Sequence, residues 1–354
     1  MIDFPTLGDL ADAWITRHCL IPDGFKRRQA FVQYDWQFWC TANHLQVRDD
    51  AEFDPEDPPL NQAFVYRRTD VVAAQKVGKG PWAACLLALM AAGPSEFAGW
   101  AEEGDAYRCA DHGCPCGWVY PYLPGEPMGM RHPSPLIQAL ATSQEQVANI
   151  WRPLSAMIRF GGSRLGKLLA PREEFIRIRN GGEDEDLEMD RIDAVTSSAQ
   201  SRLGNPISGY VQDETGTHTE RNGMADVDRK QRQGAAGMNG RGFTTTNCWD
   251  PTQQSVAQKD YEADDPDVFT FYAPPPKDLD FHDDVDRRKI LEFNYSGSPH
   301  VKVDSIEAEA VAMIKRGDGA AAERFFGNRI VEVKDAWISS EVWDGSYAGM
   351  AAES

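Results

Sequence analysis

Short apolar runs alternate with helix-forming segments along most of this chain of 354 residues. The runs have the length and the β-branched or aromatic content of buried strands, and most are followed by a segment with helical spacing of its apolar residues. Strands that alternate with helices pair in parallel, because each crossover returns the chain to the same edge of the sheet. We therefore predict an α/β fold with a mainly parallel sheet flanked by helices. The predicted strands are residues 64–74, 135–141, 175–179, 192–195, 207–211 and 243–247.

The composition fits a globular chain with one large domain or two ordinary ones. The sequence changes in character after residue 260, where acidic loops and three consecutive prolines precede two predicted helices at 305–316 and 320–326. We expect residues 1–260 to form a core, residues 261–340 a smaller subdomain, and residues 341–354 a tail. No apolar run approaches the roughly 20 residues of a membrane span. The odd number of cysteines, seven, favours a reducing compartment over a disulfide scaffold.

The net charge of −19 argues against a surface that coats nucleic acid or binds an anionic membrane. Any contact with DNA must therefore come from a local basic patch. For each candidate the alternative is ordinary solvated charge. The candidates are Lys26-Arg27-Arg28, Arg67-Arg68 and Arg229-Lys230-x-Arg232.

Two adjacent acids, Asp213 and Glu214, follow the predicted strand 207–211. A hydrolase of a magnesium–nucleotide complex needs two carboxylates at such a place, one for the water shell of the metal and one to polarise the attacking water. The same short pattern also arises by chance, in a strand that ends in a solvated turn. The interpretation therefore depends on the rest of the chain.

A glycine-lysine loop connects the predicted strand 64–74 to an apolar helix at 82–92. This strand–loop–helix order is typical of a phosphate cradle, in which backbone N–H groups at the helix start and a lysine hold phosphate oxygens. Gly80 stands where a serine or threonine hydroxyl is usual, and an alanine stands at the position of the first glycine. The sequence therefore leaves open how Mg²⁺ is held. The predicted nucleotide-binding residues of the loop are Gln75, Lys76, Val77, Gly78, Lys79, Gly80 and Pro81.

Two further segments carry alternative interpretations. The aromatic segment 25–39 is typical of a core helix, and its Gln37 is also a candidate to pair with the edge of an adenine. Cys109-x-x-His112-x-Cys114-x-Cys116 offers four ligands to a zinc ion, although the spacing is tight and a second knuckle is missing. Reduced free thiols in a loop are the alternative to zinc.

These features follow one another in an order that resembles the ATPase part of tailed-bacteriophage large terminase subunits, the DNA-packaging motors. The resemblance extends over nearly the whole chain. It implies a P-loop NTPase of the ASCE type with a small C-terminal lid. The residues that carry it are Trp36-Gln37, 75–80, 142–146, Arg202-Leu203-Gly204, 211–215, Thr245-Thr246-Asn247-x-Trp249-Asp250-Pro251 and 324–329.

The resemblance also implies a role for each matching residue. Lys79 would grip phosphate, Asp213 would bind the Mg²⁺ shell and Glu214 would activate water. Arg202 would be an arginine finger that reaches the nucleotide of a neighbouring subunit, with a structural arginine as the alternative. Thr246 and Asn247 would couple hydrolysis to movement.

The same resemblance implies ATP and Mg²⁺ as cofactors and double-stranded DNA as a partner, bound weakly by the monomer. It further implies a portal protein, a small terminase subunit, a homo-oligomeric ring on the procapsid, and the cytoplasm of an infected bacterium as the location. Family members continue into a nuclease domain near where this chain ends, so we expect no nuclease activity from it. The alternatives are a helicase-type or other translocase ATPase, and a non-catalytic nucleotide-binding scaffold.

Overall fold

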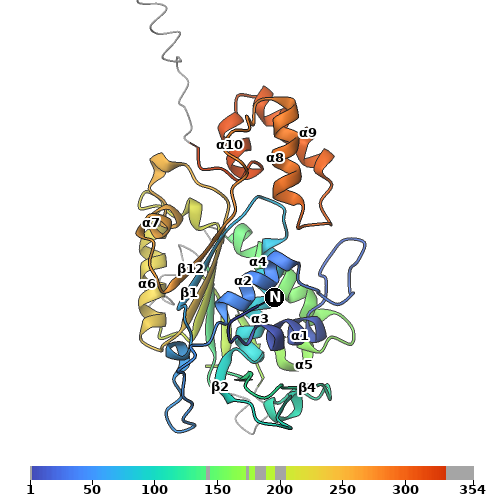
Figure 1. Ribbon diagram of the computed structural model, residues 1–354, viewed down its shortest axis with the longest axis vertical. Coiled ribbons are helices and arrows are strands. Elements are labelled where there is room, and N and C mark those ends of the chain that lie inside the picture. The colour runs from blue at the N-terminus through green and yellow to red at the C-terminus, as the bar shows by residue number, and fades with distance from the viewer. Residues whose placement is uncertain (1, 141–143, 173–174, 180–188, 196–204, 332–354) are drawn as a thin grey trace, which may run out of the picture.

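The computed structural model describes residues 2–140, 144–172, 175–179, 189–195 and 205–331 (Figure 1). None of the helices in these ranges is both long and apolar enough to cross a bilayer.

An eight-stranded sheet forms the centre of the molecule, with strand order β12-β1-β11-β10-β6-β9-β8-β7. All neighbours from β12 to β9 pair in parallel, whereas β8 pairs antiparallel with both β9 and β7. The predicted mainly parallel sheet is thus confirmed, and β11 lies between β1 and β10. The strands are β1 (Arg68–Val72), β6 (Leu136–Leu140), β7 (Leu169–Pro171), β8 (Phe175–Ile178), β9 (Arg191–Val195), β10 (Gly209–Asp213), β11 (Arg241–Thr246) and β12 (Val268–Tyr272).

Helices cover both faces of this sheet, which explains why the central strands β1, β10 and β11 are buried at every position (Figure 1). The helix α3 (Lys79–Ala92) is largely apolar and almost wholly buried, with fully buried Trp82 near its start. One face carries α1 (Gly8–His18), α2 (Asp35–His44), α3 (Lys79–Ala92), α4 (Gln144–Arg159) and α5 (Leu165–Leu168), and the other carries α6 (Met224–Ala236) and α7 (Val256–Ala263).

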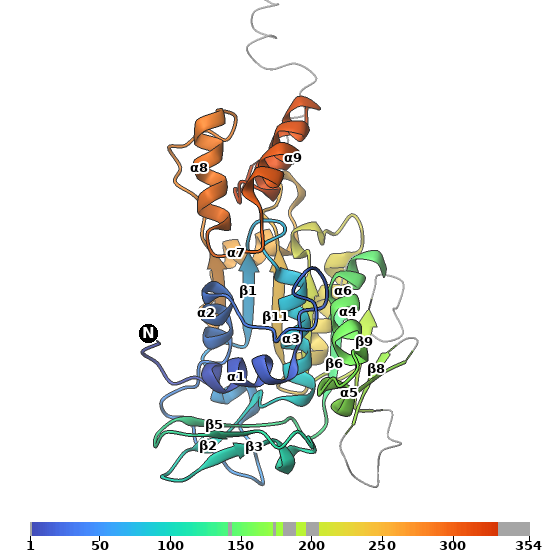
Figure 2. The same cartoon turned by 90° about the vertical axis from the view of Figure 1, so that its right-hand side faces the viewer.

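A lobe of two small antiparallel sheets lies at one end of the main sheet (Figure 2). It is built from the Gly/Pro-rich segment between α3 and β6, where short strands alternate with glycine turns. In one sheet β2 (Glu96–Trp100) pairs with β5 (Pro127–Met130), and in the other β3 (Ala106–Arg108) pairs with β4 (Val119–Pro121).

Three helices pack together at the opposite end, α8 (Asp284–Tyr295), α9 (Val303–Lys315) and α10 (Gly319–Phe325) (Figure 2). The sequence predicted the last two, with small shifts at their ends, but missed α8. The acids that made this segment look like a loop begin the helix, because the Asp283 carboxylate accepts from the backbone N–H groups of Val285 and Asp286. These helices cover the end of the main sheet at which β1 leads into the glycine-lysine loop.

Candidate active site

The glycine-lysine loop joins β1 to α3, and its backbone turns sharply at two residues. Gly78 has φ 101°, in the left-handed region that favours glycine, and it is the residue directly before α3. Lys76 also has a positive φ, 72°.

The carbonyl groups of four consecutive loop residues are held from outside the loop. Tyr295 donates its hydroxyl to the Gln75 carbonyl at 2.8 Å, and Ser298 donates to that of Val77 at 3.1 Å. His300 Nε2 lies 3.1 Å from the Lys76 carbonyl oxygen, and Gln37 Nε2 lies 3.5 Å from that of Gly78. The three residues near position 300 come from the end of α8 and the connection to α9, so the C-terminal helices fix the loop backbone.

The backbone N–H groups of residues 76–80 donate to no acceptor among the described residues. With the carbonyls held on the outer side, these groups and the positive end of the 14-residue helix α3 provide donors for an anion. The loop therefore has the chemistry of a phosphate-binding site.

Lys79 is buried and points back into the site. Its ammonium group donates to the carbonyls of Ala73 and Ala74 at 2.7 and 2.9 Å and to Asn247 Oδ1 at 2.8 Å. Burial lowers the pKa of Lys79, while the nearby carboxylates of Glu214 and Asp213 act in the opposite direction.

The two acids come to Lys79 because β10 and β11 are neighbours, with Asp213 in register with Thr245. The Thr245 hydroxyl donates to Asp213 Oδ1 at 2.7 Å. Asn247 donates its amide to both carboxylate oxygens of Glu214 at 3.0 and 3.1 Å, so Asn247 links Glu214 to Lys79.

Both carboxyl groups are in a setting that favours the protonated form. Burial raises the pKa of Asp213, and burial together with the Asp213 charge raises that of Glu214. Glu214 also has a left-handed backbone, φ 59°, which is uncommon outside glycine and is concentrated at functional sites.

Gly80, the departure from the usual loop pattern, has a steric explanation. A Cβ atom at this position would lie 2.8 Å from the backbone carbonyl oxygen of Asn149 in α4. A serine or threonine would need α4 to shift, so this loop supplies no hydroxyl for a metal.

Among the described residues, Pro81, Val77 and Gln37 do not belong to the hydrogen-bonded group around Lys79. Pro81 lies in the first turn of α3, where a proline is tolerated, and Val77 is buried. Gln37 lies in α2, is buried, and uses its side-chain oxygen to accept from the Tyr34 N–H at 3.0 Å. Its contact with Gly78 places it beside the loop, and the adenine role stays a prediction. Arg202 lies outside the described residues.

The predicted zinc set needs a correction. Cys109, Cys114 and Cys116 do come together, but the histidine beside them is His18 of α1. The His112 ring stacks instead on Tyr107, with ring centroids 4.5 Å apart. The sequence missed His18 because it lies about ninety residues away and only packing brings it to the cysteines.

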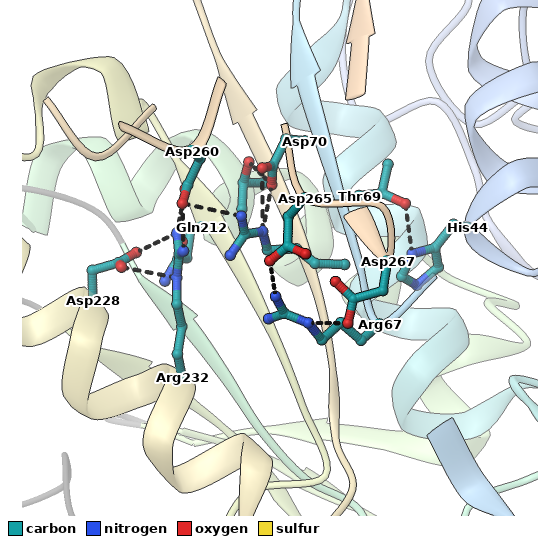
Figure 3. A network of polar contacts seen from close by, with 12 residues as sticks. His44, Arg67, Thr69, Asp70, Gln212, Asp228, Arg232, Asp260, Asp265 and Asp267 are labelled. Carbon is teal, nitrogen blue, oxygen red and sulfur yellow. Dashed lines mark hydrogen bonds and ion pairs between the residues drawn. The ribbon is translucent and has the colours of Figure 1, made fainter. Parts of the chain in front are cut away.

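Two of the three basic clusters form ion pairs with acidic residues of the same chain. Arg232 binds Asp228 at 2.8 Å and Asp260 at 2.7 Å, and Arg67 pairs with Asp265 and Asp267 (Figure 3). In the same network Arg68 pairs with Asp70 and Asp260, both at 3.0 Å, and exposed Arg229 and Lys230 pair with Asp226. The largely buried Arg68 and Arg232 need such partners and are poor candidates for binding DNA phosphates. The exposed Arg67, Arg229 and Lys230 have part of their charge neutralised by neighbouring carboxylates.

The cluster of Lys26, Arg27 and Arg28 is different. It lies on an exposed loop between α1 and α2 together with the fully exposed Phe25. The guanidinium groups of Arg27 and Arg28 lie 5.1 and 5.3 Å from the ring centroid of Phe160. Within the described residues these three side chains enter no ion pair, so this cluster keeps its charge available.

The chain matches no protein-family model and no curated protein significantly. Solved structures do resemble it. The large terminase of bacteriophage HK97 has a TM-score of 0.60 at 14% identity, and the match covers 92% of this chain and 55% of that protein. The large terminase ATPase domain of Thermus phage P74-26 has a lower TM-score, 0.42, at 8% identity, covering 77% of this chain and 93% of that domain.

The described residues thus form an α/β fold with a mainly parallel sheet, and a glycine-lysine loop lies at the carboxyl ends of its strands. This is the fold of a phage large terminase, as the match to the HK97 protein shows. The chain spans about half the length of that protein.

Proposed function

We propose that this chain is the ATP-hydrolysing motor domain of a tailed-phage large terminase, which drives double-stranded DNA into a procapsid. One observation carries the proposal. Lys79, Asn247 and Glu214 form a continuous chain of hydrogen bonds beside Asp213, next to a loop whose N–H groups have no acceptor among the described residues. The likeness of the fold to the HK97 large terminase agrees with it.

In this proposal the N–H groups of residues 76–80 and the Lys79 ammonium hold the phosphates of ATP. Asp213 offers hard carboxylate oxygens beside the loop, which suits Mg²⁺ held through its water shell, and Thr245 orients that carboxylate. A bound Mg²⁺ neutralises phosphate charge. Because Gly80 brings no hydroxyl, Asp213 would be the main protein group to hold the metal.

Glu214 is the group that accepts the proton of the attacking water. Its raised pKa makes it a better base than an exposed glutamate, as long as it is ionised at the working pH. Asn247 holds its two oxygens in place. The Lys79 ammonium already has three acceptors, so turning to a phosphate requires the release of one of them. Release of Asn247 would carry nucleotide binding to Glu214, and the Thr246 hydroxyl, which donates to the Asn247 carbonyl at 2.9 Å, would move with it. This is the coupling role that we propose for the pair.

The remaining parts of the proposal concern the assembly. A homo-oligomeric ring on the procapsid would place Arg202 of one subunit at the nucleotide of the next, and the ring would meet the portal protein and the small terminase subunit. Double-stranded DNA would pass through its channel, in the cytoplasm of the infected bacterium. The exposed Lys26, Arg27 and Arg28 are the cluster that we propose for the DNA contact.

The test replaces two site residues. Glu214→Gln keeps the shape but removes the base, so it should bind ATP with near-parent affinity and lose hydrolysis by roughly 10²–10⁴-fold. Lys79→Ala should lose ATP binding as well. Binding is measured with a fluorescent ATP analogue and hydrolysis by phosphate release, in the presence of Mg²⁺.

Glu103→Gln, an exposed change far from the loop, is the matched control and should leave both unchanged. Parent-level turnover in Glu214→Gln would show that this acid is not the base. If the parent chain bound ATP without hydrolysing it, even when concentrated, the scaffold alternative would replace the motor.

A further inference from the structure

Four potential metal ligands meet where the end of α1 touches the β3–β4 ribbon, at the opposite end of the molecule from the candidate active site (Figure 2). His18 is the last residue of α1. Cys109, Cys114 and Cys116 lie on the loop that joins β3 to β4. All four ligand atoms lie within 4.8 Å of one another.

The distances match a tetrahedral site. His18 Nε2 lies 3.6 Å from the sulfur of Cys109, 3.4 Å from that of Cys114 and 3.5 Å from that of Cys116. With Zn–N near 2.0 Å and Zn–S near 2.3 Å, a tetrahedron separates the nitrogen from each sulfur by about 3.5 Å. The three sulfurs surround one nitrogen at nearly equal distances, and none of the seven cysteines is in a disulfide.

The imidazole is held in the form that a metal needs. His18 Nδ1 lies 2.9 Å from the Trp14 carbonyl oxygen and can only donate to it, which leaves the Nε2 lone pair facing the sulfurs. The ring also stacks on Trp14, with centroids 4.4 Å apart. His18, Cys109 and Cys114 are buried and Cys116 is half-buried.

The loop backbone is built around the same point. The Cys109 N–H donates to the Trp118 carbonyl at 3.0 Å, and the Cys114 N–H donates to the Cys109 carbonyl at 2.9 Å. Gly113 and Gly117 have left-handed φ values of 76° and 67°, which let the chain turn just before Cys114 and just after Cys116.

We propose that His18, Cys109, Cys114 and Cys116 bind one structural Zn²⁺ that fastens the β3–β4 ribbon to α1. Three thiolates and one imidazole form a set that zinc favours. Four protein ligands leave no position for a water or a substrate, so the role is structural and independent of ATP hydrolysis. The proposal therefore stands or falls separately from the motor function.

The experiment measures metal bound to the full chain, purified under reducing conditions, by elemental mass spectrometry. We expect about one zinc per chain. His18→Ala and Cys114→Ser should lose it, whereas His112→Ala, the matched control on the same loop, should keep it. His18→Cys restores four ligands and should regain zinc, which separates loss of a ligand from a failure to fold.

A spectroscopic test needs no variant. After removal of metal with a chelator, added Co²⁺ should give the strong visible absorption of tetrahedral thiolate coordination, and Zn²⁺ should abolish it. Purified chain without metal that also takes up no Co²⁺ would overturn the proposal. Loss of zinc in His112→Ala with retention in His18→Ala would overturn the ligand set.

Discussion

Gly80 shows how a single residue can depart from a familiar pattern for a steric reason. The serine or threonine that is usual at this position would place its Cβ atom 2.8 Å from the carbonyl oxygen of Asn149. α4 packs so closely on the start of α3 that only glycine fits without a shift. The missing hydroxyl therefore follows from helix packing, and it leaves Asp213 as the main candidate metal residue.

Gly80→Ser tests this explanation. Because it overpacks a backbone contact, it should lower the free energy of unfolding by about 1–3 kcal/mol and should not strengthen the Mg²⁺ dependence of hydrolysis. Gly161→Ser, where a Cβ atom meets nothing within 4 Å, is the matched control and should be nearly neutral. Chemical denaturation measures the free energy of unfolding, and titration of ATPase activity with Mg²⁺ measures the metal dependence. A more stable Gly80→Ser with tighter Mg²⁺ dependence would show that α4 yields easily.

At the scale of elements, the C-terminal helices hold the backbone of the glycine-lysine loop. Tyr295 at the end of α8 and Ser298 just after it hold the carbonyls of Gln75 and Val77. The loop N–H groups can face a phosphate only while its carbonyls are held on the other side. Movement of α8 would therefore change the affinity of the loop for phosphate.

Ser298→Ala removes one of these contacts, and Ser296→Ala is its matched control because the Ser296 hydroxyl donates only within its own helix end, to Phe293. A hydrogen bond contributes about 0.5–1.5 kcal/mol, so Ser298→Ala should weaken ATP binding about 2–10-fold. Equilibrium binding of a fluorescent nucleotide measures the effect. Equal affinities in the two variants would mean that the helices do not support the loop.

At the scale of the whole molecule, the net charge of −19 and the internal pairing of two basic clusters leave little positive surface for DNA. Long-range repulsion should keep the affinity of a single chain low. Firm binding would need a ring that brings the same exposed basic loop from every subunit to one channel.

We expect the isolated chain to bind duplex DNA weakly and without sequence preference, with binding lost by about 0.2 M salt. Replacing Lys26, Arg27 and Arg28 together by alanine should lower the slope of log affinity against log salt by up to about 3. The control is Arg229→Ala with Lys230→Ala, because these side chains are already paired with Asp226. Fluorescence anisotropy at several salt concentrations gives the slopes. Tight, salt-resistant and sequence-selective binding would contradict the whole account.

Local pattern was enough to predict the parallel sheet. It also predicted, in chain order, the glycine-lysine loop, the strand that leads to the two acids and the strand that leads to Asn247. These features depend on neighbours in the chain, because strand burial and turns follow from the spacing of apolar residues and glycines. The carboxyl ends of parallel strands share one edge, and residues 79, 213 and 247 meet there. The acids before α8 misled the prediction, because an N-cap and an acidic loop have the same composition.

Contacts between distant segments were decided by the tertiary structure alone. No local pattern links Ser298 to Val77, His18 to Cys109, or Asn149 to Gly80, because each pair is brought together only when helices pack on the sheet. The same holds for the charged clusters, since a sequence counts arginines but does not show which carboxylates neutralise them. Local pattern thus predicts the sheet and the residues that lie at its edge, whereas packing decides which distant side chains contact those residues.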